Sequence, residues 1–209
     1  MKFSFKNDYS EGCHPKILEA LSQYNLDQQN GYGLDIYSEN AANIIREKSK
    51  SPESKVHLVS GGTQANLIVI SSILRPHESV VSANTGHIFT NETGAIEATG
   101  HKVHGVETKD GKLRPEDIQN VLDVHTNVPH QVKQKLVYIS NSTEVGTIYT
   151  KKELENLSEF CKKKNLYLFM DGARLGHALT AKSNDVTWED VAKLTDVYYL
   201  GGTKNGALI

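Results

Sequence analysis

The sequence predicts an α/β protein in which helices cover a mostly parallel sheet. From residue 55 onward, short apolar runs alternate with stretches at helical spacing, the order typical of repeated βα units. These runs are almost continuously apolar, which favours strands buried on both faces of a sheet. Three of the runs end in short polar signatures. Since ligands of open α/β sheets gather outside the carboxyl ends of the strands, we expect a ligand site at that edge.

The chain divides into two predicted parts. Residues 1–50 are expected to form an irregular arm followed by helices, and residues 51–209 to form the large domain. The first helix is predicted to open at Pro15, since proline is tolerated in a first turn. A second helical face is indicated by the apolar residues within 41–45.

Six apolar runs are strand candidates, and polar patterns between them predict where helices begin. The candidate strands are residues 56–59, 79–82, 102–106, 136–139, 166–170 and 197–200. Thr150 with Glu153, and Thr187 with Asp190, have the spacing of capping boxes. Pro115 is followed by acidic residues, as in the first turn of a helix.

Composition excludes several classes of protein. A net charge of −2 with interspersed signs gives no electrostatic footprint for nucleic acid or a membrane surface. No apolar stretch approaches the ~18 residues of a membrane span, and the first residues do not build a signal peptide. Cys13 and Cys161 lack metal-ligand spacing. We therefore expect a cytoplasmic protein without a metal site, with Cys161 an ordinary helix residue and Lys162–Lys164 a solvated helix end.

The first polar signature, Gly61-Gly62-Thr63, lies between an apolar run and a helical stretch. Glycines let backbone N–H groups approach a phosphate, and a helix N-terminus adds positive potential. Gly62 and Thr63 are therefore candidate phosphate ligands. An ordinary turn between a strand and a helix explains the motif equally well, and the spacing is not that of a Walker or Rossmann loop.

The second signature, Asp171-Gly172-Ala173-Arg174, follows five consecutive apolar residues. A carboxylate that emerges from a buried strand needs a partner, because an unpaired buried charge costs several kcal/mol. A protonated pyridine nitrogen would serve for Asp171. The alternative is a salt bridge with Arg174, which is equally placed to bind a substrate carboxylate.

Lys204 and His87 complete the candidate set. Lys204 follows the last apolar run and two glycines, and its amine becomes nucleophilic only if desolvated or placed near positive charge. His87 follows a strand candidate and could stack on a cofactor ring and move protons. A phosphate turn, an acid and a lysine at one sheet edge are what pyridoxal phosphate requires.

These motifs, taken together, resemble the threonine aldolase/β-eliminating lyase family, which uses pyridoxal 5′-phosphate on fold type I. The resemblance is closest to its low-specificity L-threonine aldolase-like branch and covers essentially the whole chain. The motifs that carry it are residues 7–12, 61–66, His87 with 92–95, 141–146, 171–174 and Lys204.

The resemblance implies roles for individual residues. Lys204 would hold the cofactor covalently, Asp171 would pair with the pyridine nitrogen, and His87 would stack on the ring. Arg174 would bind the substrate carboxylate. The implied reaction cleaves Cα–Cβ of a β-hydroxy amino acid such as L-threonine or L-allo-threonine, giving glycine and an aldehyde.

The chain departs from the family pattern in the segments that face the substrate. Better-known aldolases have a histidine where we align Thr143 and a serine where we align Asn7. Asn7 and Asn141 are nevertheless predicted substrate-binding residues. Family members act as homodimers or homotetramers with shared sites, so Tyr32 and the arm are expected to serve a neighbouring subunit.

The chain stops five residues after Lys204, whereas family members continue with another strand and a C-terminal small domain. We therefore expect a truncated chain without that small domain. The alternatives are another fold-type I enzyme, such as a β-eliminating lyase or an aminotransferase, or a truncated remnant without catalysis. Cysteine desulfurases typically place histidine directly before the lysine, where this chain has Thr203.

Overall fold

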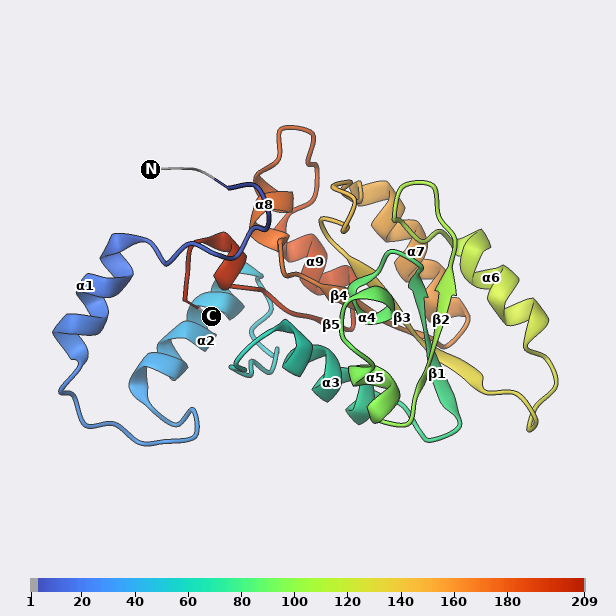
Figure 1. Cartoon of the computed structure of the whole chain (residues 1–209), viewed down its shortest axis with the longest axis horizontal. Coiled ribbons are helices and arrows are strands. Elements are labelled where there is room, and N and C mark those ends of the chain that lie inside the picture. Colours follow the sequence, from blue (N-terminus) through green and yellow to red (C-terminus); the bar gives the residue numbers. More distant parts are fainter. Residues whose placement is uncertain (1–3, 209) are drawn as a thin grey trace.

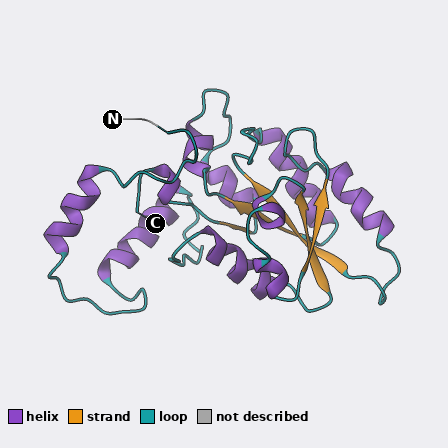
Figure 2. Cartoon of the chain, viewed as in Figure 1, coloured by secondary structure: helices purple, strands orange, loops and turns teal. Residues whose placement is uncertain are grey.

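The computed structural model describes residues 4–208, which build a five-stranded sheet with helices on both faces (Figures 1 and 2). The strands are β1 (Glu78–Ala83), β2 (Lys102–Val106), β3 (Lys133–Ser140), β4 (Tyr167–Asp171) and β5 (Val197–Tyr198). Their order across the sheet is β2-β1-β3-β4-β5, and every neighbouring pair is parallel. The predicted helix-covered parallel sheet is confirmed.

The helices lie in two layers around this sheet. One face carries α3 (Gly62–Ile73), α4 (His87–Thr90) and α5 (Ala95–Ala98), and the other carries α6 (Pro115–Val124), α7 (Lys151–Lys163), α8 (Leu175–Thr180) and α9 (Trp188–Leu194). Figure 1 shows α3 and α5 on one side of the strands and α7 and α9 on the other.

Side chains of each strand alternate between the two layers, because successive residues of a strand point to opposite faces. In β4, Leu168 and Met170 pack with α7 and α8, whereas Phe169 packs with Leu136 and Tyr138 on the α3 side. All three β4 residues are essentially without exposed surface. This burial on both faces explains why the strands read as continuous apolar runs.

The predicted helix starts are confirmed by their hydrogen bonds. Thr150 and Glu153 form a reciprocal capping box at the start of α7, and Thr187 and Asp190 form one at the start of α9. At α6, the carboxylate of Asp117 accepts a hydrogen bond from the backbone N–H of Arg114. Each box satisfies backbone groups that the first turn of a helix leaves unpaired.

Two strand predictions need correction. Residues 56–59 form no strand, because this segment pairs with no neighbouring strand of the described chain. Residues 197–200 contribute only Val197–Tyr198 to the sheet, since the chain turns away toward Gly201 and Gly202.

The lysine-rich end of α7 is a helix terminus, as predicted. The helix ends at Lys163 with Lys162 in its last turn, where cations are favoured by the helix dipole.

Cys161 is buried in the core, and burial together with the charge of Asp196 raises the pKa of its thiol to about 12. It is an ordinary helix residue rather than an activated thiol.

Helices α1 (Pro15–Tyr24) and α2 (Ile36–Lys48) lie away from the sheet (Figure 1). Neither contains a buried residue. The arm is fastened near the last residues of the chain, where the backbone N–H of His14 donates to the carbonyl oxygen of Gly206 at 2.9 Å. The division of the chain after residue 50 stays a prediction.

Within residues 4–208, no helix combines the length and apolar character needed to cross a bilayer.

The difference in burial along β4 yields a test of the core. Phe169 has no exposed surface, so Phe169→Ala is expected to lower the free energy of unfolding by about 3–5 kcal/mol. Tyr167→Ala, at an end of the same strand where 41 % of the residue is exposed, should cost about 1 kcal/mol or less. Urea titrations of both variants measure the difference, and equal losses would contradict the described packing.

Candidate active site

The carboxyl edge of the sheet brings together residues that are far apart in the sequence. His87 follows β1, Glu144 follows β3, Asp171 ends β4, and Lys204 follows β5 on a short 3-10 helix, η1 (Thr203–Asn205). Because all these strands are parallel, their carboxyl ends meet at one edge. The charges of Asp171 and Lys204 both lie close enough to His87 to influence its pKa.

Asp171 is a deeply buried acid of this edge, with 4 % of its surface exposed. One carboxylate oxygen accepts a hydrogen bond from the Tyr138 hydroxyl, and the other accepts from the backbone N–H of Ala173 at 2.9 Å. Among residues 4–208, no lysine, arginine or histidine lies within ion-pair distance of this carboxylate. The salt bridge with Arg174 considered from the sequence is therefore absent, and Asp171 has only neutral partners.

Two tyrosines, not identified from the sequence as site residues, surround Asp171. Tyr138 is fully buried, and burial together with the Asp171 charge raises the pKa of its hydroxyl well above the ordinary value. Burial and the same charge also raise the pKa of Tyr199. Both residues lie in predicted strand runs, and strand alternation places Tyr138 on the α3 face. Nothing in the sequence marked them as partners of the acid.

Arg174 binds an acid of the N-terminal arm instead of Asp171. Its guanidinium donates from Nε and Nη2 to the two carboxylate oxygens of Asp8, at 2.5 and 3.1 Å. Burial alone would raise the pKa of Asp8, but the hydrogen bond and charge of Arg174 outweigh it and lower this pKa below its ordinary value. Arg174 is thus already set to hold a carboxylate in two-point fashion.

Lys204 lies beside this pair. Its Nζ is 3.8 Å from Asp8 Oδ1 and 5.6 Å from the ring centre of Tyr9, and 18 % of its side chain is exposed. The predicted proximity of Lys204 and Arg174 is therefore realised through Asp8. The arm residue Asp8 carries no special signal in the sequence beyond its place in the motif of residues 7–12.

Close backbone contacts hold the segments that carry Asp171 and Lys204 together. The N–H of Gly201 donates to the carbonyl oxygen of Gly172 at 3.0 Å. A Cβ at Gly172 would lie 1.8 Å from the carbonyl oxygen of Tyr199, so any other side chain would force the two segments apart. Asn205 adds hydrogen bonds to the carbonyl oxygens of Ala173 and Gly201.

His87 is held by a buried acid. Its Nδ1 donates to Glu92 Oε1 at 2.9 Å, and the same oxygen accepts from the side-chain amide of Asn66 at 2.7 Å. Only 1 % of the Glu92 side chain is exposed, against 33 % for His87. The hydrogen bond to Glu92 raises the pKa of His87, outweighing burial, which lowers it. The hydrogen bond to Glu92 fixes the orientation of the His87 ring and leaves Nε2 as the ring nitrogen that Glu92 does not engage.

Glu144 is a second acid near His87 and was not singled out from the sequence. Its Oε1 accepts from the Ser140 hydroxyl at 2.6 Å and from the backbone N–H of His87 at 3.0 Å. Burial raises the pKa of Glu144, and the nearby Asp171 charge adds to this. Glu144 therefore links the ends of β1 and β3.

Gly62 and Thr63 lie in the first turn of α3, although no strand precedes them. The residue before the helix, Gly61, supplies no side-chain cap, so the first N–H groups of α3 remain open to an anion. A Cβ at Gly62 would lie 2.8 Å from the Tyr199 hydroxyl, which shows that this turn packs closely against the residue beside Asp171.

The two predicted substrate ligands, Asn7 and Asn141, have different surroundings. Asn7 accepts hydrogen bonds from the N–H of Tyr9 and the hydroxyl of Ser10, and its neighbour Asp8 reaches Arg174. Asn141 is fully buried, and its side-chain oxygen accepts from the N–H of Tyr149 at 3.3 Å. Their contact with a substrate stays a prediction.

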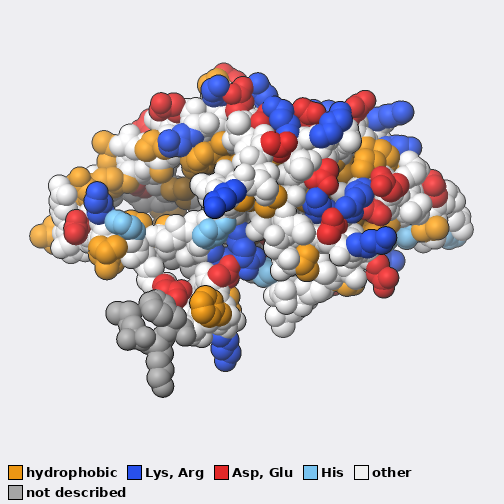
Figure 3. Space-filling view, turned by 90° about the horizontal axis from the view of Figure 1, so that it is seen from above, with side chains coloured by type: hydrophobic (Ala, Val, Ile, Leu, Met, Phe, Trp, Pro, Cys, Tyr) orange, Lys and Arg blue, Asp and Glu red, His pale blue; other side chains and the backbone are white. Residues whose placement is uncertain are grey.

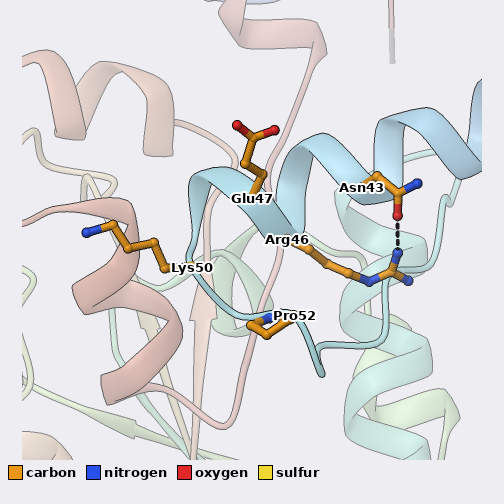
Figure 4. Close-up of a pocket in the computed structure, with 5 residues that line it drawn as sticks. All are labelled: Asn43, Arg46, Glu47, Lys50 and Pro52. Atoms are coloured by element: carbon orange, nitrogen blue, oxygen red, sulfur yellow. Dashed lines mark hydrogen bonds between the residues drawn. The ribbon is translucent and has the colours of Figure 1, made fainter.

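A separate pocket opens beside α2 (Figure 4). Its lining residues are Asn43, Arg46, Glu47, Lys50 and Pro52, and Arg46 donates to the side-chain oxygen of Asn43 at 2.9 Å. None of the predicted site residues lines it. The chemistry-bearing residues gather at the sheet edge instead.

Comparison with known proteins gives consistent matches. A family model described as beta-eliminating lyase matches residues 9–208. A low specificity L-threonine aldolase of Pseudomonas aeruginosa is 31 % identical over 210 residues, and one of another Pseudomonas strain is 33 % identical. A solved structure described as Leishmania major threonine aldolase superposes with a TM-score of 0.97 at 53 % identity.

The chain is covered almost completely in these matches, but the relatives are longer. Each Pseudomonas alignment includes 98 % of this chain and 59 % of the relative, and the Leishmania structure is matched over 99 % of this chain and 60 % of that one. The chain therefore spans about three fifths of the length of the proteins it resembles.

The His87–Glu92 contact predicts a pH response. Glu92→Gln should lower the pKa of His87, because the amide keeps a hydrogen-bond acceptor but removes the negative charge. Since the folded-state pKa is raised, the stabilisation from this pair is fully present below about pH 6.5 and is lost as pH rises through the raised value. NMR titration of the imidazole ring measures the shift. Glu97→Gln, at an exposed position of α5, is the control, and an unchanged His87 titration in Glu92→Gln would refute the assignment.

Proposed function

Because the chain belongs to the beta-eliminating lyase family, we propose that it cleaves Cα–Cβ of a β-hydroxy amino acid with pyridoxal 5′-phosphate as cofactor. The substrates we propose are L-threonine or L-allo-threonine, which give glycine and acetaldehyde. The fold class and the resemblance predicted from the sequence are confirmed by the same matches, and the predicted enzyme class and cofactor agree with them.

The observation that carries this proposal is the buried carboxylate of Asp171, which has no cationic partner in the described structure. A protonated pyridine nitrogen supplies the missing positive charge, and the ion pair would persist in the low-dielectric interior. The uncapped first turn of α3 suits the phosphate, with Gly62 and Thr63 as its ligands. Lys204 would hold the cofactor covalently through its amine, and His87 would stack on the ring.

When bound, the cofactor supplies an electron sink for the electron pair released at Cα. The protein's own residues then have separate tasks. Arg174 holds the amino-acid carboxylate in the two-point geometry in which it now holds Asp8, so that Asp8 must give way to the substrate. Asp171, supported by Tyr138, keeps the pyridine nitrogen protonated. The His87 ring is oriented by Glu92.

The proposed oligomeric state rests on exposed apolar side chains, and the proposed cytoplasmic location rests on the two cysteines. Apolar side chains of α1 and α2 are exposed at one end of the molecule (Figure 3), among them Leu18, Leu21, Tyr24, Ile36 and Ile44. A second copy of the chain would cover these exposed apolar faces. Their exposure therefore supports a homodimer or homotetramer in which the arm and Tyr32 serve a neighbouring site. Cys13 and Cys161 are both free thiols, which supports a reducing cytoplasmic setting.

The lysine assignment is tested by absorption spectroscopy. Purified protein mixed with pyridoxal phosphate should develop a visible absorption band that Lys204→Ala lacks, because the covalent link needs the Lys204 amine. Lys152→Ala, an exposed lysine on α7, should keep the band. A soluble, folded protein without a Lys204-dependent band would overturn the cofactor proposal.

Arg174→Lys tests the carboxylate-binding role. Lysine keeps the positive charge but loses the two-point hydrogen bonding, so KM for L-threonine should rise roughly tenfold or more with a smaller change in kcat. Glycine production measures both constants. An unchanged KM would remove Arg174 from the substrate site. Cofactor binding without any glycine production in the unmodified protein would favour a non-catalytic remnant.

A further inference from the structure

The proposed cleavage requires a base for the β-hydroxyl proton of the substrate, and the inference here rests on that proposed function. A base at this edge must have a basic atom without a hydrogen-bond partner and must be reachable from the site. The acids and bases considered there are Asp8, His87, Glu92, Glu144, Asp171 and Lys204. His177 of α8 also lies nearby, but its Nε2 is engaged with the backbone carbonyl oxygen of Lys204 at 2.8 Å.

Most of these groups are occupied. Both oxygens of Asp171 accept hydrogen bonds, and this acid faces the pyridine nitrogen in the proposed site. Glu92 is 1 % exposed, so a substrate cannot reach it. Asp8 has both oxygens on Arg174 and must leave when the substrate carboxylate binds.

The two nitrogen bases are also poor candidates. Lys204 is the residue for cofactor attachment. His87 holds its proton more tightly than an ordinary histidine, because Glu92 raises its pKa. Its Nδ1 is already engaged with Glu92, and a raised pKa favours the protonated ring, which gives a proton rather than accepting one.

Glu144 meets both requirements. Its Oε1 is fixed by the Ser140 hydroxyl and by the N–H of His87, whereas no other residue donates a hydrogen bond to its Oε2 in the part of the chain that the structure describes. The residue is half-buried, so the carboxylate is both held in place and accessible. Its attachment to the backbone of His87 places it next to the ring proposed to stack on the cofactor.

We propose that the Glu144 carboxylate is the base that removes the β-hydroxyl proton of the substrate. In this step the O–H bond breaks and its proton moves to Oε2 of Glu144, while the oxygen forms the C=O bond of the aldehyde. The Cα–Cβ bond breaks, and its electron pair stays with the amino-acid fragment until a proton at Cα completes glycine. The proton and the electron pair are thus both accounted for, and no oxidant or reductant is needed.

The surroundings of Glu144 suit this role. The groups that face it are Ser140 and Tyr138 of β3, Asp171 of β4, Tyr199 after β5, Arg174 before α8 and His87 of α4. Burial and the Asp171 charge raise the pKa of Glu144, which makes the carboxylate a stronger base than an exposed glutamate.

The test is Glu144→Gln, which keeps an oxygen for Ser140 and for the His87 N–H but cannot accept the proton. We expect cleavage of L-threonine to fall at least a hundredfold, the usual share of a general base. Exchange of the glycine α-proton with deuterated solvent, followed by NMR, should fall less than threefold, because glycine has no hydroxyl. Glu159→Gln, on the exposed side of α7, is the control and should change neither rate.

Other outcomes are equally informative. Equal losses of cleavage and exchange in Glu144→Gln would overturn the proposal and assign Glu144 a structural role. Unimpaired cleavage would also overturn it. If the unmodified protein binds no pyridoxal phosphate and exchanges no glycine proton, the proposed function itself fails, and this result is distinct from either of the others.

A second readout needs no cofactor. In cofactor-free protein with ¹³C-labelled glutamate, one side-chain carboxyl should titrate above the ordinary pKa of about 4.3, and its signal should be missing in Glu144→Gln. A Glu144 carboxyl that titrates at or below the ordinary value would contradict the basicity on which the proposal depends.

Discussion

The buried carboxylate of Asp171 is the constraint on which the site depends. It sits at the end of a strand covered on both faces, so water cannot solvate it, and the protein supplies only a hydroxyl and a backbone N–H. A buried carboxylate with only neutral partners is a favourable place for an incoming positive charge. Gly172 and Gly201, which let the two flanking segments touch, bring Lys204 to the same edge. The glycines that allow the close packing of these segments are therefore also what brings the candidate catalytic groups together.

The acids of the site have separate roles because their surroundings differ. Asp171 is enclosed and reserved for a cation, Glu92 is enclosed and orients His87, and Glu144 is anchored through one oxygen only. Asp8 differs again, since it comes from the arm and holds Arg174. Identical side-chain chemistry thus yields an ion-pair partner, a positioning group, a candidate base and a counter-ion.

Much of the fold could be predicted from the sequence, because burial on two faces leaves continuous apolar runs and helix starts leave capping patterns. β1 to β4 and the caps at Thr150 and Thr187 follow these local rules. Residues 56–59 fit the same apolar pattern yet form no strand, since a strand also needs a neighbour to pair with. The motif residues Asp171, Arg174 and Lys204 were found because each follows an apolar run. Tyr138, Tyr199, Glu144 and Asp8 were missed as site residues because their roles arise from contacts between distant segments.

The pairing of Asp8 with Arg174 couples the site to the least protected part of the chain. Helices α1 and α2 contain no buried residue, so this region opens at a lower free-energy cost than the sheet. When it detaches, Arg174 and Lys204 lose their shared counter-ion, and their positive charges become free to pair with another anion. A ligand carboxylate or phosphate would then take the place that Asp8 leaves, so that opening of the arm and binding of an anion are linked through this one ion pair.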